Sequence, residues 1–249
     1  AWTARDAHKA MARSFGWQWL IFKLMARYKL DFKWRRKSKY DRRAALGSSL
    51  VASLRRSLMD RNVPLWLNTD FQDVLLDGDR VCGIKVATGG KVLELKARRA
   101  VIFGSGGFEQ NQTLREKYLP QPTRASWSAT PPGNNTGAAL EAGMHIGAAT
   151  ALMDWAWWAP TIAVPGEEKP RGVFVERAFP GAIVVNSLGR RFVNEAAPYL
   201  EFVDAMYQDN QKTDGRSVPS WVIFDGHFRH TYAMGPLMPA QVVPDSRLR

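Results

Sequence analysis

The chain has 249 residues, of which 45% are hydrophobic and 11% aromatic, so it is long enough to bury a sizeable core. The formal net charge is +12, but the basic residues crowd the first sixty or so positions, so the charge marks one segment. The single cysteine, Cys82, excludes an intramolecular disulfide, and we therefore expect a reducing, cytoplasmic environment. We also expect no signal peptide at the start.

Residues 1–45 contain few helix breakers, and we predict that they are helical. Residues 15–25 are the most apolar part, but Lys23 interrupts them and they are too short to span a bilayer. Two interpretations stay open: this face packs on its own protein, or it lies on an anionic membrane surface. The basic run at residues 33–43 lacks the zinc, RNP and zipper signatures of nucleic-acid recognition, so we expect no nucleic-acid partner.

The hydrophobic period then changes from helical to strand-like. Leucines at helical spacing predict an amphipathic helix over residues 44–62. Short apolar runs separated by glycine-containing turns predict a β-meander, with strands at residues 65–67, 74–76, 81–86 and 92–95. The meander leads into the apolar run 100–103, which we predict to be a strand buried in a sheet.

A glycine cluster follows that apolar run. The sequence of residues 101–109 predicts a buried strand, a tight turn and the start of a helix. Because glycine has no side chain, a ligand can approach the backbone of the turn closely, and the amides of a helix N-terminus suit an anionic group. Glu109 stands where a dinucleotide-binding fingerprint has its third glycine, so the turn is not that fingerprint. On the local pattern alone, an ordinary strand-to-helix turn is favoured.

The second half of the chain mixes loops, short helices and strands. Residues 135–137 predict a loop before a short helix at 138–145, with Asn135 or Thr136 as its cap. Three tryptophans within residues 155–158 suggest an apolar wall, although ordinary core packing explains them equally well. Further on, we predict strands at residues 183–186 and 221–225, and a helix at 198–206.

Several motifs occur in an order and at a spacing that resemble a known family. They are Gly-Ser-Gly-Gly-Phe-Glu at 104–109, Asn-Thr-Gly at 135–137, Asp-Trp-Ala-Trp at 154–157, Gly-Arg-Arg-Phe-Val-Asn-Glu at 189–195, Pro-Tyr at 198–199, Val-Pro-Ser at 218–220 and Ile-Phe-Asp at 223–225. Together they resemble the FAD-dependent 3-ketosteroid dehydrogenases, within the wider flavoprotein family of succinate dehydrogenase and fumarate reductase. The Pro-Tyr pair directly after Asn-Glu is the mark of the steroid branch.

The resemblance implies an α/β fold of mixed α+β character. A partial, Rossmann-like FAD-binding domain with a β-meander would cover residues 1–150, including a basic helical segment at 1–62. Part of an α+β catalytic domain would cover residues 151–249. The N-terminal GxGxxG strand and the C-terminal part of the family are not recognised in this sequence, so we interpret the chain as an internal fragment that holds FAD weakly or not at all.

The resemblance also implies roles for individual residues. Tyr199 matches the catalytic tyrosine, which removes a proton next to the steroid ketone while the flavin takes a hydride from the adjacent carbon. We expect no metal ion. The residues implied to bind FAD are Phe71, Gly104, Ser105, Gly106, Gly107, Asn135, Thr136 and Gly137, and those implied to line the substrate pocket are Trp155 and Trp157.

The implied partners are a steroid or another flat, apolar ketone and an external electron acceptor. The apolar, basic segment at residues 15–25 adds a membrane surface to the open partners, for a protein that is cytoplasmic or peripheral at the membrane. Two alternatives stay open. One is a fumarate-reductase-like flavoprotein that acts on another unsaturated acid, for which Arg190 and Arg191 are candidate ligands. The other is a non-catalytic basic module that binds membrane surfaces.

Overall fold

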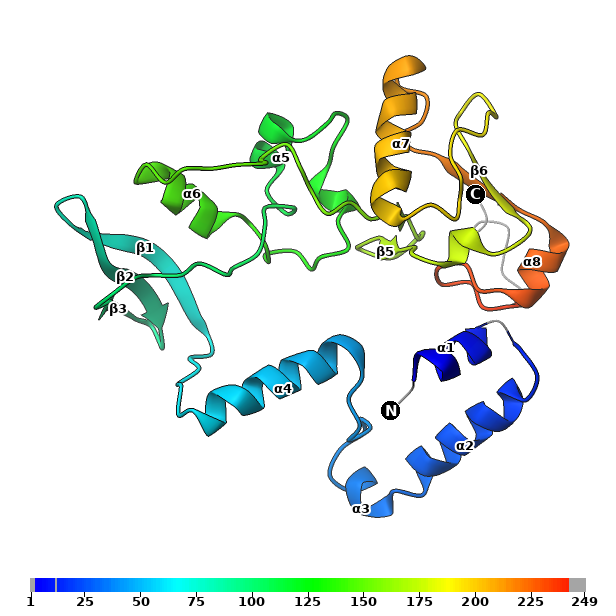
Figure 1. The fold of residues 1–249 in the computed structure, drawn as a ribbon, viewed down its shortest axis with the longest axis horizontal. Helices are drawn as coiled ribbons and strands as arrows, with labels where there is room; N and C mark the ends of the chain where they lie inside the picture. The colour runs from blue at the N-terminus through cyan, green and yellow to red at the C-terminus, as the bar shows by residue number, and fades with distance from the viewer. Residues whose placement is uncertain (1–2, 12, 242–249) are drawn as a thin grey trace. The chain divides into compact units, whose positions relative to one another are not determined.

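The computed structural model describes residues 3–11 and 13–241, so the outermost parts of the two predicted domains, 1–2 and 242–249, lie outside the described residues. The chain divides into two compact units, Ala1–Thr69 and Asp70–Arg249, called here the N-terminal and C-terminal units. Their helices and strands are labelled in Figure 1. The predicted boundary at residue 150, between a cofactor domain and a catalytic domain, stays a prediction.

The N-terminal unit is helical, as predicted, but its first helix is interrupted. The unit contains α1 (Ala4–Met11), α2 (Trp17–Lys29), α3 (Phe32–Arg35) and α4 (Leu46–Asp60). Gly16, with a φ of 79°, separates α1 from α2, because glycine adopts this left-handed conformation without strain. Helix α4 confirms the helix predicted at residues 44–62.

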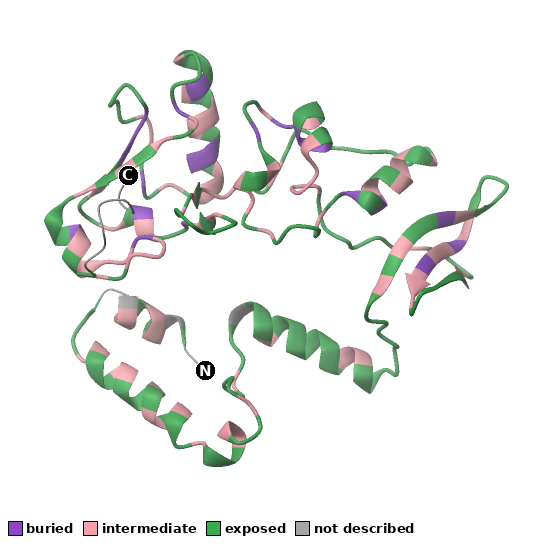
Figure 2. Ribbon diagram, turned by 180° about the vertical axis from the view of Figure 1, so that it is seen from behind, coloured by how far each residue is buried: buried purple, intermediate pink, exposed green. Residues whose placement is uncertain are grey.

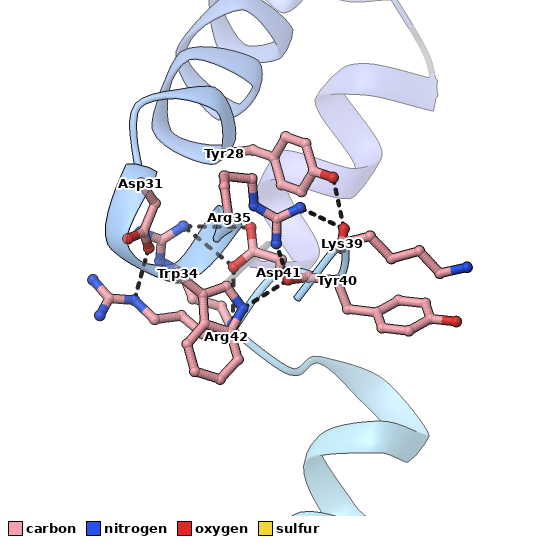
Figure 3. Close-up of polar contacts among 9 residues, drawn as sticks. Tyr28, Asp31, Trp34, Arg35, Lys39, Tyr40, Asp41 and Arg42 are labelled. Atoms are coloured by element: carbon pink, nitrogen blue, oxygen red, sulfur yellow. Dashed lines mark hydrogen bonds and ion pairs between the residues drawn. The ribbon is translucent and has the colours of Figure 1, made fainter. Parts of the chain in front are cut away.

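Residues 36–45 are not helical, which corrects the prediction of helix through residue 45. Figure 3 shows why the chain folds back here. The side chains of Tyr28 and Trp34 each donate a 2.7 Å hydrogen bond to a backbone carbonyl of residues 39–40, and Arg35 donates to both carbonyls. These bonds to side chains hold the segment against α2 and α3 in place of further helical turns.

The predicted β-meander is confirmed as a three-stranded sheet in the order β1 (Thr69–Asp77), β2 (Arg80–Thr88), β3 (Lys91–Lys96). Strands β2 and β3 are antiparallel, with Gly83 opposite Lys96 and Thr88 opposite Lys91. The strand predicted at residues 65–67 does not form. Those residues follow Pro64 in irregular structure, and proline has no backbone N–H to give to a ladder.

The strand predicted at residues 100–103 does not form either. Among the described residues no strand pairs with it, and Ile102 is 92% exposed. A lone extended segment lacks the inter-strand hydrogen bonds that define a strand. The helix expected directly after the glycine turn begins later, as α5 (Gln112–Tyr118), where the Asn111 side chain accepts a 3.1 Å hydrogen bond from the Leu114 N–H.

The core of the C-terminal unit lies around two short strands. Strands β6 (Ala182–Val185) and β7 (Trp221–Phe224) are antiparallel, and both were predicted. Val222 packs against two buried clusters, which are Val173, Phe228 and Met234, and Val184, Phe202 and Val203. Figure 2 shows buried residues on β6 and on α7 (Tyr199–Lys212), the predicted helix extended by six residues.

The remaining elements are α6 (Ala138–His145), α8 (Gly226–Thr231), the pair β4 (Thr161–Ile162) and β5 (Arg171–Gly172), and the 3-10 turns η1 (Ala125–Trp127) and η2 (Glu176–Ala178).

A buried ionic network fixes the turn that precedes α7. The Glu195 carboxylate accepts a 2.8 Å hydrogen bond from the Val184 N–H of β6 and pairs with Arg191. The buried guanidinium of Arg177 donates to the backbone carbonyls of Glu195 and Ala197. Burial alone would raise the pKa of Glu195, but the bonds from Arg191 and Val184 outweigh it and hold that pKa below its usual value.

We expect Glu195→Gln to lower the free energy of unfolding at neutral pH by about 1–3 kcal/mol, because a charged, buried acceptor is lost. The pKa of Glu195 is lower in the folded state, so its stabilisation is complete above the ordinary glutamate pKa of 4.5. The stabilisation disappears as the pH falls through the lowered value. Urea unfolding of both proteins at neutral and strongly acidic pH measures the difference. A difference that is equal at both pH values would contradict this role.

Candidate functional site

The two segments predicted to bind the cofactor lie side by side in the C-terminal unit. The Glu109 carboxylate accepts a 2.5 Å hydrogen bond from Asn135 Nδ2 and a 2.9 Å bond from Thr130 Oγ1. Asn111 Nδ2 donates a 2.9 Å bond to the Thr136 carbonyl. These contacts join the end of the glycine turn to the Asn-Thr-Gly loop and make them one surface.

Two glycines of the turn differ in how closely the rest of the protein packs on them. Gly106 has a φ of 85°, and a Cβ there would lie 2.5 Å from Asn135 Oδ1, so only glycine permits this close approach. A Cβ on Gly104 would meet nothing within 4 Å. Gly104 and Ser105 are both exposed. One side of the turn is therefore closed by the loop, and part of its backbone stays open.

The predicted cap of α6 is wrong in detail. Gly137, with a φ of 81°, occupies the N-cap position, so no side chain caps the helix. The Asn135 side chain is used elsewhere, because it donates to Glu109. Gly137 packs tightly, since a Cβ there would lie 2.7 Å from a methyl group of Leu114. The loop thus turns into the helix through a glycine, and its asparagine holds the neighbouring segment.

Phe71 also reaches this region. It lies on β1, and its ring meets the ring of Phe103 edge to face with centroids 5.2 Å apart. Phe103 directly precedes Gly104. The structure therefore gathers Phe71, the glycine turn and the Asn-Thr-Gly loop, which are the residues implied to hold FAD. Open glycine backbone, an exposed serine hydroxyl and an aromatic ring fit a group with phosphates, hydroxyls and a flat ring system.

The sequence reasoning missed the role of Glu109. In the sequence it is the residue that replaces the third glycine of a fingerprint and the last residue of the motif at 104–109. In the structure its carboxylate connects three segments: the turn, Thr130 and Asn135. The available signal in the sequence was a carboxylate next to a glycine turn. Sequence spacing alone does not show which donors lie within reach of that carboxylate.

Tyr199 begins α7 and lies among aromatic side chains. Trp157 Nε1 donates a 2.9 Å hydrogen bond to Tyr199 Oη. The ring of Phe174 meets the Tyr199 ring edge to face at 5.7 Å. Trp157 and Trp155 are 79% and 68% exposed, so they present aromatic surface. The indole donor orients the Tyr199 oxygen and leaves the hydroxyl proton free to point elsewhere.

Trp158, the third tryptophan of this stretch, belongs to the core. It packs on the cluster that contains Val184 and Phe202, and its ring lies 5.5 Å from that of Tyr207. Core packing is therefore the role of Trp158, and the apolar wall formed by Trp155 and Trp157 stays a prediction. Trp155 and Trp157 form exposed surface, and Trp158 is ordinary packing.

A second network ties α7 to the segment that carries the glycine turn. Tyr207 Oη donates a 3.1 Å hydrogen bond to the Pro122 carbonyl. Arg115 of α5, a buried residue, donates to Thr123 Oγ1 and to the Glu109 carbonyl. Burial lowers the pKa of Arg115 and raises that of Tyr207. The helix that begins at Tyr199 and the segment of Glu109 are thus connected through the half-buried Tyr207 and the buried Arg115 and Thr123.

A family model described as "FAD binding domain" matches residues 3–242, and the chain belongs to this family. The cofactor that the family indicates is FAD. The predicted fold class and the resemblance to ketosteroid dehydrogenases are both confirmed by these matches and by those that follow.

Three similar proteins are named as steroid dehydrogenases. The chain is 40% identical over 211 residues to the 3-oxosteroid 1-dehydrogenase of Mycolicibacterium smegmatis, covering 82% of this chain and 37% of that protein. It is 33% identical over 256 residues to that of Comamonas testosteroni, covering 99% and 43%. A crystal structure of 3-ketosteroid delta1-dehydrogenase from Sterolibacterium denitrificans, in complex with 1,4-androstadiene-3,17-dione, matches with a TM-score of 0.91 at 53% identity. That match covers 98% of this chain and 44% of the other.

The chain therefore spans less than half the length of these relatives. The matches do not favour the fumarate-type alternative or the non-catalytic module. For Arg191, a candidate ligand in the fumarate-type alternative, the structure agrees with the matches, because its guanidinium is paired with the Glu195 carboxylate. Within the part of the chain that the structure describes, we find no helix of the length and apolarity needed to cross a bilayer.

Proposed function

We propose that the chain forms part of a flavin-dependent 3-ketosteroid dehydrogenase, which removes two hydrogens from a steroid ring. The observation that carries this proposal is the hydrogen bond from Trp157 to Tyr199, at an exposed aromatic surface, in a chain of the FAD-binding family. Once its own hydroxyl proton has passed to solvent, the Tyr199 oxygen would receive the proton from the carbon next to the ketone. When bound, FAD supplies the acceptor for the hydride from the adjacent carbon, and the ring double bond forms between the two carbons.

The residues at Tyr199 favour a flat, apolar ketone as substrate. Two side chains in contact with Tyr199, those of Trp157 and Phe174, are aromatic. Aromatic surface suits the hydrocarbon rings of a steroid, whereas a dicarboxylate requires cationic ligands. We place FAD along Phe71, Gly104, Ser105, Gly106, Gly107, Asn135, Thr136 and Gly137. An external acceptor must then take the two electrons from the cofactor.

The partners in this proposal include a membrane surface, since steroids partition into membranes. A cytoplasmic location, with peripheral attachment, is consistent with the single cysteine. The division of residues 1–150 and 151–249 into a cofactor part and a catalytic part belongs to the same proposal.

The reaction is tested by product analysis in the protein that carries this chain. A saturated-ring 3-ketosteroid, incubated with the protein and a dye as electron acceptor, should yield a product lighter by two hydrogens. Mass spectrometry of the steroid detects it. If the dye is reduced only when a dicarboxylate replaces the steroid, the proposed substrate class is wrong.

A further inference from the structure

Tyr199 is the first residue of α7, and this helix lacks the feature that usually fixes a helix start. Pro198 occupies the N-cap position, and no side chain caps the helix there. Helix starts are usually fixed by a Ser, Thr, Asp or Asn side chain that binds the first free N–H groups. The position of Tyr199 therefore depends on contacts that another segment makes with the turn before α7 and with its first helical turn.

Arg177 of η2 makes such contacts on both sides of Tyr199. Its Nη1 donates to the Glu195 carbonyl, and its Nη2 donates a 2.8 Å hydrogen bond to the Ala197 carbonyl. Its guanidinium carbon lies 4.6 Å from the centroid of the Phe202 ring, a cation–π contact within the first turn of α7. Two of these contacts precede Tyr199 in the chain and one follows it, so a single planar group spans the start of the helix.

The burial of Arg177 carries a cost that packing alone does not explain. The residue is 3% exposed, and among the described residues its Nε has no hydrogen-bond partner. Burial lowers the pKa of Arg177, against the attraction of the Glu176 and Glu195 carboxylates. Apolar side chains of similar volume often replace buried charges without loss of stability. A buried charge with an unused donor, bonded to the turn that carries a candidate base, is better explained by the geometry that it imposes.

The segment that carries Arg177 also reaches the ring of Tyr199. Phe174, which precedes η2, meets that ring edge to face. The Glu176 carboxylate accepts 3.1 Å hydrogen bonds from the N–H groups of Phe174 and Val175, and these bonds tie the backbone before η2 to η2 itself. Residues 174–177 therefore contact the helix start through Arg177 and the phenol ring through Phe174.

We infer that Arg177 is a positioning residue for Tyr199. By holding the Glu195 and Ala197 carbonyls, its guanidinium keeps the Tyr199 oxygen where the hydrogen bond from Trp157 Nε1 and the reacting carbon of a ketosteroid can both reach it. Displacement of a reacting group by about 1 Å can cost about a hundredfold in rate. The inference rests on the proposed function, because Arg177 acts through Tyr199 as the base.

The first test is Arg177→Lys in the protein that carries this chain. Lysine keeps the charge but cannot bridge both carbonyls with a planar fork. We expect kcat to fall about 10- to 100-fold, while KM for the steroid changes less than about threefold. In the Tyr199→Phe background the same substitution should lower kcat less than about twofold, because the oxygen that it positions is gone. Mass spectrometry of the steroid product measures these rates.

A second measurement does not depend on turnover. In nuclear magnetic resonance spectra of nitrogen-labelled protein, the indole N–H resonance of Trp157 reports its hydrogen bond to the Tyr199 oxygen. Its loss in Trp157→Phe assigns the resonance. We expect Arg177→Lys to shift this resonance towards the position that it takes in Tyr199→Phe.

Arg229→Lys is the matched control. Arg229 lies on α8, and its guanidinium also donates a 2.7 Å hydrogen bond to a backbone carbonyl, that of Met238. The same change of side chain is therefore made at an arginine that holds a different part of the backbone. We expect Arg229→Lys to leave kcat within about twofold of the parent and the Trp157 resonance unchanged.

Equal losses of kcat with Tyr199 present and in the Tyr199→Phe background would overturn the inference, because Arg177 would then serve the fold in general. An unchanged Trp157 resonance in Arg177→Lys would overturn it too. If Arg177→Lys does not fold, Phe202→Leu replaces it, since this change keeps most of the core volume and removes the ring that contacts the guanidinium. The same shift and the same dependence on Tyr199 are then expected, and their absence contradicts the inference.

Product formation by the parent protein separates this inference from the proposed function. A parent that forms no dehydrogenated steroid contradicts the proposed function, while the Trp157 resonance still reports whether Arg177 holds the Tyr199 oxygen in place. A parent that dehydrogenates the steroid, with a kcat and a resonance that do not respond to Arg177→Lys, contradicts the inference alone.

Discussion

Replacing Tyr199 with phenylalanine, in the protein that carries this chain, is expected to lower kcat about 100- to 10,000-fold, the usual range for loss of a general base. The substitution removes one oxygen, the atom that accepts the hydrogen bond from Trp157 Nε1. The ring stays, so its contact with Phe174 is preserved. FAD content should be unchanged, because none of the residues placed along the cofactor contacts this oxygen. Steady-state turnover of a 3-ketosteroid and the visible flavin spectrum measure the two effects.

Tyr207→Phe is the matched control on the same helix. Its hydroxyl bonds the Pro122 carbonyl and takes no part in the proposed reaction. We expect this variant to lose about 1 kcal/mol of stability, from one hydrogen bond, and to keep most of its kcat. If Tyr199→Phe retained near-parental turnover, or if both variants lost activity equally, Tyr199 would not be the base.

Removing the Glu109 carboxylate, as Glu109→Ala, is expected to weaken FAD binding about 10- to 100-fold. This corresponds to the 1.5–3 kcal/mol typical of hydrogen bonds to a charged group. The carboxylate joins Asn135 to Thr130, so its loss loosens the Asn-Thr-Gly loop, which then keeps only the bonds from Asn111 to the Thr136 carbonyl and from the Gln110 N–H to the Asn135 carbonyl. The effect reaches FAD through the position of the loop, which makes Glu109 a positioning residue. Flavin fluorescence during titration of the apoprotein with FAD measures the dissociation constant.

Glu116→Gln serves as the control for charge. Glu116 lies on α5 and bonds Gln112, away from the loop. We expect its FAD dissociation constant to match that of the parent protein. Thermal unfolding of both apoproteins shows whether Glu109→Ala stays folded. A Glu109→Ala protein that remains folded and binds FAD as tightly as the parent would remove the residue from the cofactor site.

The elements that the sequence predicted best are those whose partners lie nearby in the chain. The β-meander is confirmed because its turns join neighbouring strands, so local turn chemistry sets the pairing. Helix α6 is confirmed to the residue, at Ala138–His145. The run at 100–103 failed for the opposite reason. Its apolar sequence is that of a buried strand, but a strand depends on a neighbour, and no described segment pairs with it.

The sequence named candidate residues of the site but did not predict the contacts between them. Glycine at 106 indicated close backbone approach, and the structure shows that the approaching group is Asn135. The contact of Trp157 with Tyr199 joins residues 42 positions apart. Neither contact follows from residue type or local spacing. The network from Tyr207 to Arg115 does not follow from local spacing either, because the tertiary fold determines which polar groups meet.

Anaerobic addition of a 3-ketosteroid to the flavin-loaded protein is the most direct measurement of the proposed chemistry. With no electron acceptor present, transfer of the hydride should bleach the flavin absorption band in proportion to the steroid added. Succinate, added at the same concentration, should leave the band unchanged. A flavin that bleaches with the dicarboxylate and stays oxidised with the steroid would contradict steroid dehydrogenation at Tyr199.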